Sequence, residues 1–189
     1  MEEGEGSIKW TRLGRRELLR CAVFSVAELE NVGPGGWRGR FTVLEAPDWA
    51  AVVPLVRRDG EDCFLMVRQY RHGSDELSLE FPGGTVEPGE EPAAAAAREL
   101  AEETGYEASS IRLAGSVFPN PAIMSNRFHV FLAEGLTRAH PTDFDEHEAI
   151  DSFLVSVREV RAAMGTGEYS HALMATALFL ADRLLAKAP

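Results

Sequence analysis

The chain has 189 residues, of which 45% are apolar, so it can bury one sizeable core and still carry an extension. Its formal net charge is −11 and its isoelectric point is near 4.9, which argues against nucleic acid or an anionic membrane as a partner. Residues 1–10 are acidic where a secretory signal needs basic side chains, and the longest apolar run, residues 172–181, is too short to span a bilayer. We therefore expect a cytoplasmic protein.

The N-terminal part of the chain predicts a small antiparallel sheet. Residues 1–7 are rich in glycine and glutamate, which predicts disorder, and residues 10–44 are strand-like, with an apolar segment at residues 19–26 and a turn at residues 33–36. Two or three strands are not stable alone. Residues 1–46 must therefore pack on the main domain or pair with a second copy of the chain.

Residues 47–189 predict a mixed sheet that is covered by helices on both faces, which is an α/β fold. A turn is expected at residues 59–60, and Ser156 with Glu159 forms a capping box for a short helix. Ser170 is the expected cap of the last helix, whose apolar face carries Leu173, Ala177 and Leu180. The predicted strands are residues 49–56, 63–70, 77–81, 111–118, 127–132 and 150–155.

The cysteines and histidines show no metal-binding pattern. Cys21 and Cys63 each lie in an apolar, strand-like run, which predicts two buried free thiols. His129 lies in a predicted strand and is expected to pack in the sheet. The remaining histidines that we considered have no metal-like spacing: His72, His140 and His171.

Residues 83–106 read GGTVEPGEEPAAAAARELAEETGY and predict a helix with clustered carboxylates. Pro92 suits the first turn, alanines follow it, and Gly105 stands where a left-handed stop is expected. Three glutamates at the spacing i, i+3 and i+4 have Cβ atoms about 5–6 Å apart on one helix face. They are Glu99, Glu102 and Glu103.

Clustered glutamates are harmless on a solvated surface and costly in a cleft. A like-charged pair about 4 Å apart costs about 1 kcal/mol in bulk water and about 4 kcal/mol at an effective dielectric of 20. Hard divalent ions such as Mg²⁺ prefer oxygen ligands and are commonly shared between carboxylates and a substrate's phosphates. The helix alone therefore leaves two interpretations open, a metal site or a charged, solvated face.

The whole string resembles the signature of the Nudix hydrolases. Gly84, five residues, Glu90, seven residues and then RELAEETG at residues 98–105 match its fixed positions. The last position, usually aliphatic, is Tyr106 here, a departure that bears on packing behind the helix. The resemblance implies the family's α/β/α sandwich with a mixed sheet, to which this chain adds the N-terminal β extension.

The resemblance also assigns roles within residues 83–106. Arg98 would orient the glutamates by ion pairing, and Glu90 would support the junction between loop and helix. Mg²⁺ is the expected cofactor, with Mn²⁺ as a possible substitute. The catalytic and metal-binding groups would be the carboxylates of Glu99, Glu102 and Glu103, with the backbone carbonyl of Gly83 as a further ligand.

The flanking residues resemble the ADP-ribose pyrophosphatase branch of the family. This likeness rests on VRQYR at residues 67–71, LEFPGG at residues 79–84, and Pro121 beyond the box. It makes Arg71 and Glu80 substrate-binding residues, with the Arg71 guanidinium facing the diphosphate oxygens. The alternative for Arg71 is a solvent-exposed side chain at a strand end.

A second acidic group, DFDEHE at residues 143–148, precedes the last predicted strand. In the same branch a glutamate-rich loop at this point supplies a base and a further metal ligand. By position, Glu146 would be the base that acts on the attacking water, and Glu148 the extra ligand. Ala149 stands where the branch has an acidic residue, and an ordinary acidic surface loop is the alternative interpretation.

The resemblance implies Mg²⁺-dependent hydrolysis of ADP-ribose, or of a similar nucleotide sugar, to a nucleoside monophosphate and a sugar phosphate. One alternative is hydrolysis of GDP-mannose or another nucleotide sugar. A second is a non-hydrolysing, nucleotide-sensing domain, although such domains typically have decayed boxes and every carboxylate is present here. In this branch the N-terminal sheet is exchanged within a homodimer, which we expect here, whereas a sheet folded back on its own domain is the alternative.

Overall fold

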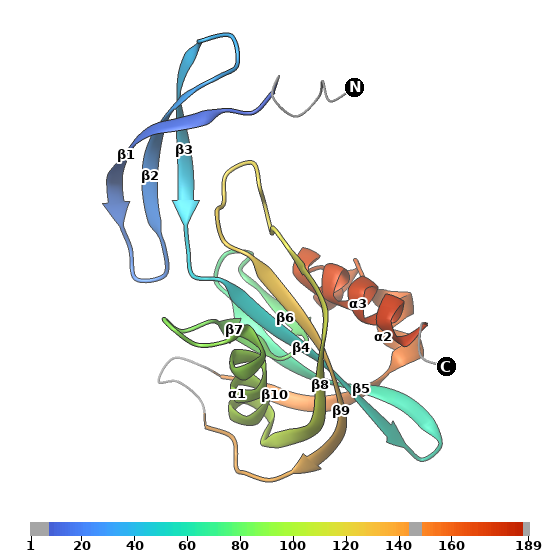
Figure 1. Ribbon diagram of the computed structural model, residues 1–189. Helices are drawn as coiled ribbons and strands as arrows, with labels where there is room; N and C mark the ends of the chain where they lie inside the picture. Colours follow the sequence, from blue (N-terminus) through green and yellow to red (C-terminus); the bar gives the residue numbers. More distant parts are fainter. Residues whose placement is uncertain (1–7, 144–148, 187–189) are drawn as a thin grey trace. The chain divides into compact units, whose positions relative to one another are not determined.

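The computed structural model describes residues 8–143 and 149–186, and the chain forms two compact units (Figure 1). One unit comprises residues 1–47 together with residues 118–127, and the other comprises residues 48–117 and 128–189. The disorder predicted for residues 1–7 concerns a segment outside the described residues.

Within residues 8–47, three strands form an antiparallel sheet in the order β1-β2-β3. A hydrogen bond of 2.9 Å from the Cys21 N–H to the Phe24 carbonyl closes the first turn. The loop at residues 118–127 joins this sheet, because the Leu44 N–H donates to the Ile123 carbonyl at 2.7 Å. The strands are β1 (Thr11–Arg20), β2 (Ser25–Val32) and β3 (Arg38–Glu45).

Two features of this sheet differ from the prediction. The apolar segment at residues 19–26 contains the turn between β1 and β2 and is not one continuous strand. Cys21 lies in that turn and is exposed, so the prediction of a buried thiol is wrong for this residue, whereas Cys63 is buried. The apolar neighbours of Cys21 lie near a hairpin end, where the chain reverses and few groups can cover it.

The described part of the second unit contains one mixed sheet of seven strands around β4 (Trp49–Arg58). The strand order is β10-β5-β4-β9-β8, with β6 added to β5 and β7 added to β4. β4 and β9 run parallel, and the other pairs are antiparallel. The remaining strands are β5 (Glu61–Arg71), β6 (Glu76–Glu80), β7 (Gly83–Thr85), β8 (Tyr106–Val117), β9 (Phe128–Arg138) and β10 (Asp151–Ser156).

Helices cover both faces of this sheet (Figure 1). Successive β4 residues face opposite sides, because side chains alternate along a strand. Ala50 and Val52 pack with Leu100 of α1 in one core, while Ala51 and Val53 pack with residues of α2 and α3 in the other. This arrangement confirms the predicted α/β/α sandwich with a mixed sheet. The helices are α1 (Pro92–Thr104), α2 (Val157–Ala163) and α3 (Ala172–Leu185), and a 3-10 helix, η1 (Gly167–Tyr169), precedes α3.

Of the two predicted serine caps, one is confirmed and the other is wrong. The Ser156 hydroxyl accepts a hydrogen bond of 3.1 Å from the Glu159 N–H, which confirms this predicted cap. Ser170 does not cap α3, because the chain between η1 and α3 places His171 at that position. No helix of the described residues is long and apolar enough to cross a membrane. The expected apolar face of α3 contributes to the core through Leu173, Ala177 and Leu180.

Candidate active site

Helix α1 begins and ends where the sequence predicts. Pro92 occupies its first turn, and Gly105 ends it in the left-handed conformation, with φ of 75° and its N–H donating to the Ala101 carbonyl at 2.8 Å. A Cβ on Gly105 would lie 2.3 Å from the backbone oxygen of His140. Both the conformation and this close approach therefore require glycine.

The Gly83–Gly84 segment lies between β4 and the glutamates of α1. Gly83 pairs with Ala51, and Gly84 pairs with Ala50. A Cβ on Gly83 would lie 2.4 Å from the Ala50 backbone oxygen, and a Cβ on Gly84 would lie 2.2 Å from Oε1 of Glu99. Two successive glycines thus let the backbone approach a strand on one side and a carboxylate on the other.

Two carboxylates from successive turns of α1 meet at this segment. Oε2 of Glu103 accepts a hydrogen bond of 3.0 Å from the Gly83 N–H, and the Glu99 carboxylate packs against Gly84. Glu103 is 4% exposed and the Glu99 side chain is 14% exposed, whereas Glu102 is more open at 41%. Burying carboxylates is costly unless cations or hydrogen bonds compensate. The alternative interpretation of a solvated helix face is therefore excluded for Glu99 and Glu103.

Arg98 connects the helix to the loop before it. Its Nη1 donates to Oε1 of Glu99 and to Oε2 of Glu102, both at 2.9 Å. Its Nε donates to Oε1 of Glu90 at 3.1 Å, and its Nη2 donates to the Thr85 carbonyl at 3.0 Å. The hydrogen bond to Glu90 is the largest of the effects that raise the pKa of Arg98, and the same bond lowers the pKa of Glu90.

The α1 glutamates supply the type of ligand atom that a hard divalent cation prefers. They offer carboxylate oxygens, and Gly84 lets the Glu99 carboxylate approach the backbone more closely than the Cβ of any other residue would allow. Arg98 Nη1 lies between the Glu99 and Glu102 oxygens. No three histidine, cysteine, aspartate or glutamate side chains close around one point in residues 8–143 and 149–186. The carboxylates are thus the type of ligand that Mg²⁺ prefers, but in this arrangement Arg98 lies between two of them and supplies the positive charge.

Arg71 and Glu80 form a bidentate ion pair. Nε of Arg71 donates to Oε1 of Glu80 at 2.7 Å, and Nη2 donates to Oε2 at 2.6 Å. The Glu80 side chain is 1% exposed, whereas that of Arg71 is 43% exposed. Burial raises the pKa of Glu80, but the hydrogen bonds from Arg71 and the close approach of His171 outweigh it and lower the pKa to about 2. The structure thus pairs the two predicted substrate-binding residues with each other.

His171 is a member of this group that sequence reasoning missed. Its Nδ1 lies 3.1 Å from Oε2 of Glu80, an ion-pair distance without the alignment of a hydrogen bond. Nearby, the Phe81 N–H donates to Sδ of Met174 in the first turn of α3 at 3.0 Å. No local pattern links residues so distant in sequence, so only the fold reveals this contact.

The acidic loop predicted to supply the base begins beside α1. The Asp143 N–H donates to the Glu102 carbonyl at 2.9 Å. Glu146 and Glu148 lie outside the described residues, and their predicted roles stay predictions.

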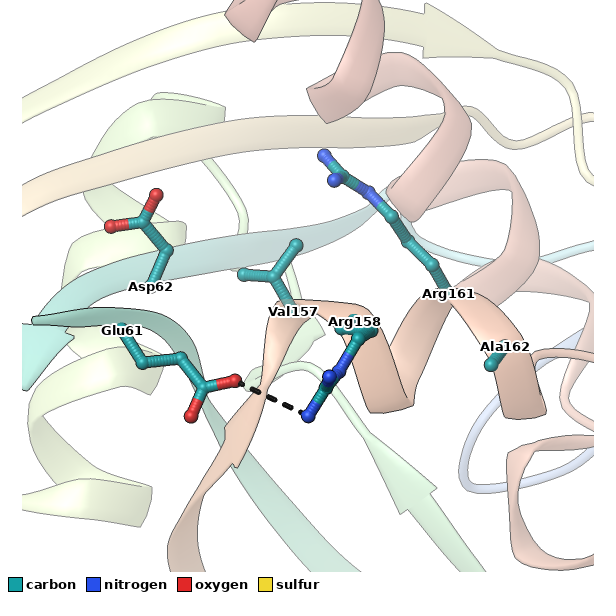
Figure 2. A pocket seen from close by; sticks show the side chains of 6 residues that line it. All are labelled: Glu61, Asp62, Val157, Arg158, Arg161 and Ala162. Carbon is teal, nitrogen blue, oxygen red and sulfur yellow. Dashed lines mark ion pairs between the residues drawn. The ribbon is translucent and has the colours of Figure 1, made fainter.

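A separate charged groove of about 540 Å³ lies between the start of β5 and α2, and none of the α1 glutamates lines it (Figure 2). Its basic groups are paired with acidic ones: Arg158 lies 4.0 Å from Glu61, and Arg161 binds Asp182 at 2.7 Å. Nothing in its lining resembles a phosphate or metal site.

Comparisons with known proteins agree with this geometry. The sequence model of the NUDIX domain family matches residues 46–175, which include α1, β7 and the Arg71–Glu80 pair. A methanol dehydrogenase activator of Bacillus methanolicus is 31% identical over 127 residues, 67% of each chain. An ADP-ribose pyrophosphatase of Bacillus subtilis is 30% identical over 146 residues, 77% of each chain. The crystal structure of an ADP compounds hydrolase matches with a TM-score of 0.83 over 97% of both chains, at 24% identity.

Proposed function

The chain belongs to the Nudix family, and on this premise we propose that it cleaves ADP-ribose, or a similar nucleoside diphosphate sugar, to a nucleoside monophosphate and a sugar phosphate. The observation that carries the proposal is the meeting of the buried Glu99 and Glu103 carboxylates at Gly83–Gly84. The name of the Bacillus subtilis relative, an ADP-ribose pyrophosphatase, supports ADP-ribose as the first substrate to test.

Mg²⁺, with Mn²⁺ as a substitute, would be held by the carboxylates of Glu99, Glu102 and Glu103 and by the backbone carbonyl of Gly83. Such a cation, when bound, neutralises diphosphate charge and polarises the phosphorus–oxygen bonds. Arg98 would retain its bonds to Glu90 and Thr85, which hold it beside the glutamates. Most of the catalytic effect would come from positioning and electrostatics.

Arg71 would bind the substrate diphosphate. Glu80 accepts hydrogen bonds from the guanidinium edge formed by Nε and Nη2, and the edge formed by Nη1 and Nη2 suits two phosphate oxygens. The buried Glu80 carboxylate would therefore act on the substrate through Arg71. Its low pKa keeps this carboxylate ionised at neutral pH.

Glu146 would serve as the base for the attacking water, and Glu148 as a further metal ligand. The support for this part is the hydrogen bond between Asp143 and Glu102, which brings the start of the acidic segment to the glutamate helix. Glu146→Gln should lower kcat much more than it changes KM, and an unchanged kcat would remove Glu146 from the mechanism.

We also propose that the N-terminal sheet of residues 1–46 is exchanged in a homodimer, with residues 47–189 as the hydrolase domain. The sheet exposes large apolar side chains, which favours burial against a second copy. Light scattering coupled to gel filtration tests this assembly, and a monomeric mass would contradict it. The exposed large apolar residues in this part of the chain are Ile8, Trp10, Leu13, Leu18, Leu19, Val23, Trp37 and Phe41.

The activity is tested by measuring product release from ADP-ribose, GDP-mannose and UDP-glucose, each with Mg²⁺, Mn²⁺ or a chelator. ADP-ribose should be the best substrate, and the chelator should abolish turnover. Faster hydrolysis of GDP-mannose than of ADP-ribose would change the substrate assignment. Nucleotide binding without any turnover would indicate a sensor. Wild-type hydrolysis is the reference for the variants.

Glu103→Gln should lower turnover about a hundredfold or more, because it removes one metal-binding charge. The side-chain carbonyl of the introduced glutamine can still accept from the Gly83 N–H, so the free energy of unfolding should change by no more than about 1 kcal/mol. Glu107→Gln is the matched control, since Glu107 follows α1 and its side chain is 59% exposed. Full activity of Glu103→Gln would contradict the proposed site.

A further inference from the structure

The Glu80 carboxylate has two basic neighbours that come from distant parts of the chain. Arg71, at the end of β5, contacts both of its oxygens at 2.6–2.7 Å. His171, directly before α3, approaches Oε2 at 3.1 Å, and its Nδ1 is buried. One carboxylate thus links a strand end to a helix start.

Arg71 depends on this carboxylate for its orientation. In the ladder between β5 and β6, Val67 lies opposite Glu80 and Arg71 lies opposite Glu76. Residues two and four apart on a strand share one face, so the guanidinium extends back along that face to reach Glu80. A long arginine side chain has many rotamers, and the bidentate pair restricts it to one position.

Glu80 is in turn positioned by the first turn of α3. Arg71 holds one side of the carboxylate, and His171 lies against Oε2. The adjacent Phe81 N–H donates to Met174 Sδ, so α3 contacts both the side chain of Glu80 and the backbone that follows it. Among the residues that the structure describes, movement of His171 would therefore leave the carboxylate with its Arg71 contacts alone.

We propose that His171 is a positioning residue for substrate binding, which acts through Glu80 to hold Arg71 where it meets the diphosphate. The inference rests on the proposed function, in which Arg71 binds the diphosphate of a nucleoside diphosphate sugar. It adds the residue directly before α3 to a group whose other members lie on β5 and β6.

His171→Leu should raise KM for ADP-ribose about tenfold, the factor that about 1.4 kcal/mol produces, because Glu80 loses one polar partner. The value of kcat should stay unchanged, because the substitution does not alter the α1 glutamates. His171→Asn should restore KM, because Nδ2 of asparagine has the same place on Cγ as Nδ1 of histidine. His140→Leu is the matched control, because His140 pairs with Glu107 at 2.7 Å on the surface.

A double-mutant cycle separates positioning from a purely structural role. In an Arg71→Ala background, His171→Leu should leave KM unchanged, because the residue that it positions is gone. A tenfold increase in KM that persists in the Arg71→Ala background would overturn the inference. A wild-type KM for His171→Leu alone would overturn it as well. Thermal unfolding checks that each variant is folded, and His171→Gln replaces His171→Leu if the latter does not fold.

Titration with ADP in Mg²⁺ distinguishes failure of the inference from failure of the proposed function. Absence of ADP-ribose turnover by the wild-type chain would overturn the proposed function. The dissociation constant of ADP would still depend on Arg71. His171→Leu should weaken ADP binding about tenfold, and only when Arg71 is present. An equal dissociation constant for wild type and His171→Leu would overturn the role of His171.

Discussion

Gly84→Ala should separate activity from stability, because the added methyl group meets a side chain rather than the backbone. The new Cβ would lie 2.2 Å from Oε1 and 2.6 Å from Cδ of Glu99. Ordinary contact begins near 3.4 Å, so the carboxylate must move by roughly 1 Å. A displacement of about 1 Å in a catalytic group can cost about a hundredfold in rate.

The same change should cost little folding free energy. The Glu99 carboxylate is the end of a flexible side chain and can turn away toward water. The hydrogen bond from Arg98 that is then lost contributes about 1 kcal/mol, because Arg98 keeps its other partners. Replacing glycine by alanine also lowers the entropy of the unfolded chain, which contributes about 0.4–1 kcal/mol in the opposite direction. The two effects nearly cancel.

Gly83→Ala provides the contrast, because its Cβ would lie 2.4 Å from the Ala50 backbone oxygen and 2.8 Å from the Ala51 Cα. Backbone of the central strand cannot turn away, so this variant should lose about 1–3 kcal/mol. The assay is kcat/KM for ADP-ribose in Mg²⁺ together with urea unfolding. Wild-type activity of Gly84→Ala, or a loss of several kcal/mol in its stability, would refute the reasoning.

Two further predictions concern stability. The pKa of Glu80 is about 2 against an ordinary value of 4.5, so its contribution, on the order of 3 kcal/mol, is complete above pH 4.5 and is lost as pH falls toward 2. The difference in free energy of unfolding between wild type and Glu80→Gln, measured with urea, should decrease over that pH range. A difference that stays constant would contradict this prediction. Gly105→Ala should cost at least about 1–2 kcal/mol by the same measurement, since φ is 75° and the His140 carbonyl is close; unchanged stability would exclude this cause.

Local sequence patterns predict the elements that are stabilised by residues close together in the sequence. Helix α1 has its proline, its alanines and its terminal glycine in sequence, and Ser156 lies three residues before the N–H that it caps. The apolar run that forms β4 predicts a strand buried on both faces, which the two cores confirm. The spacing of the glutamates likewise predicts one helix face.

Features that depend on distant residues could not be predicted in this way. β7 contains two glycines and has no strand propensity of its own, and it forms because Gly83 and Gly84 pair with β4. Phe81 and Met174 are 93 residues apart, and the contact of His171 with Glu80 spans nearly the same separation. The family resemblance predicts that Arg71 and Glu80 bind substrate, but only the structure shows that they bind each other.

The proposed role of the α1 glutamates is to hold a divalent cation that hydrolysis of the diphosphate would require. Its most direct test is AMP release from ADP-ribose by the wild-type chain, measured with Mg²⁺, after chelation, and after Mg²⁺ is restored. Turnover should stop when the chelator is added and return when Mg²⁺ is restored. Turnover that continues undiminished in excess chelator would contradict it.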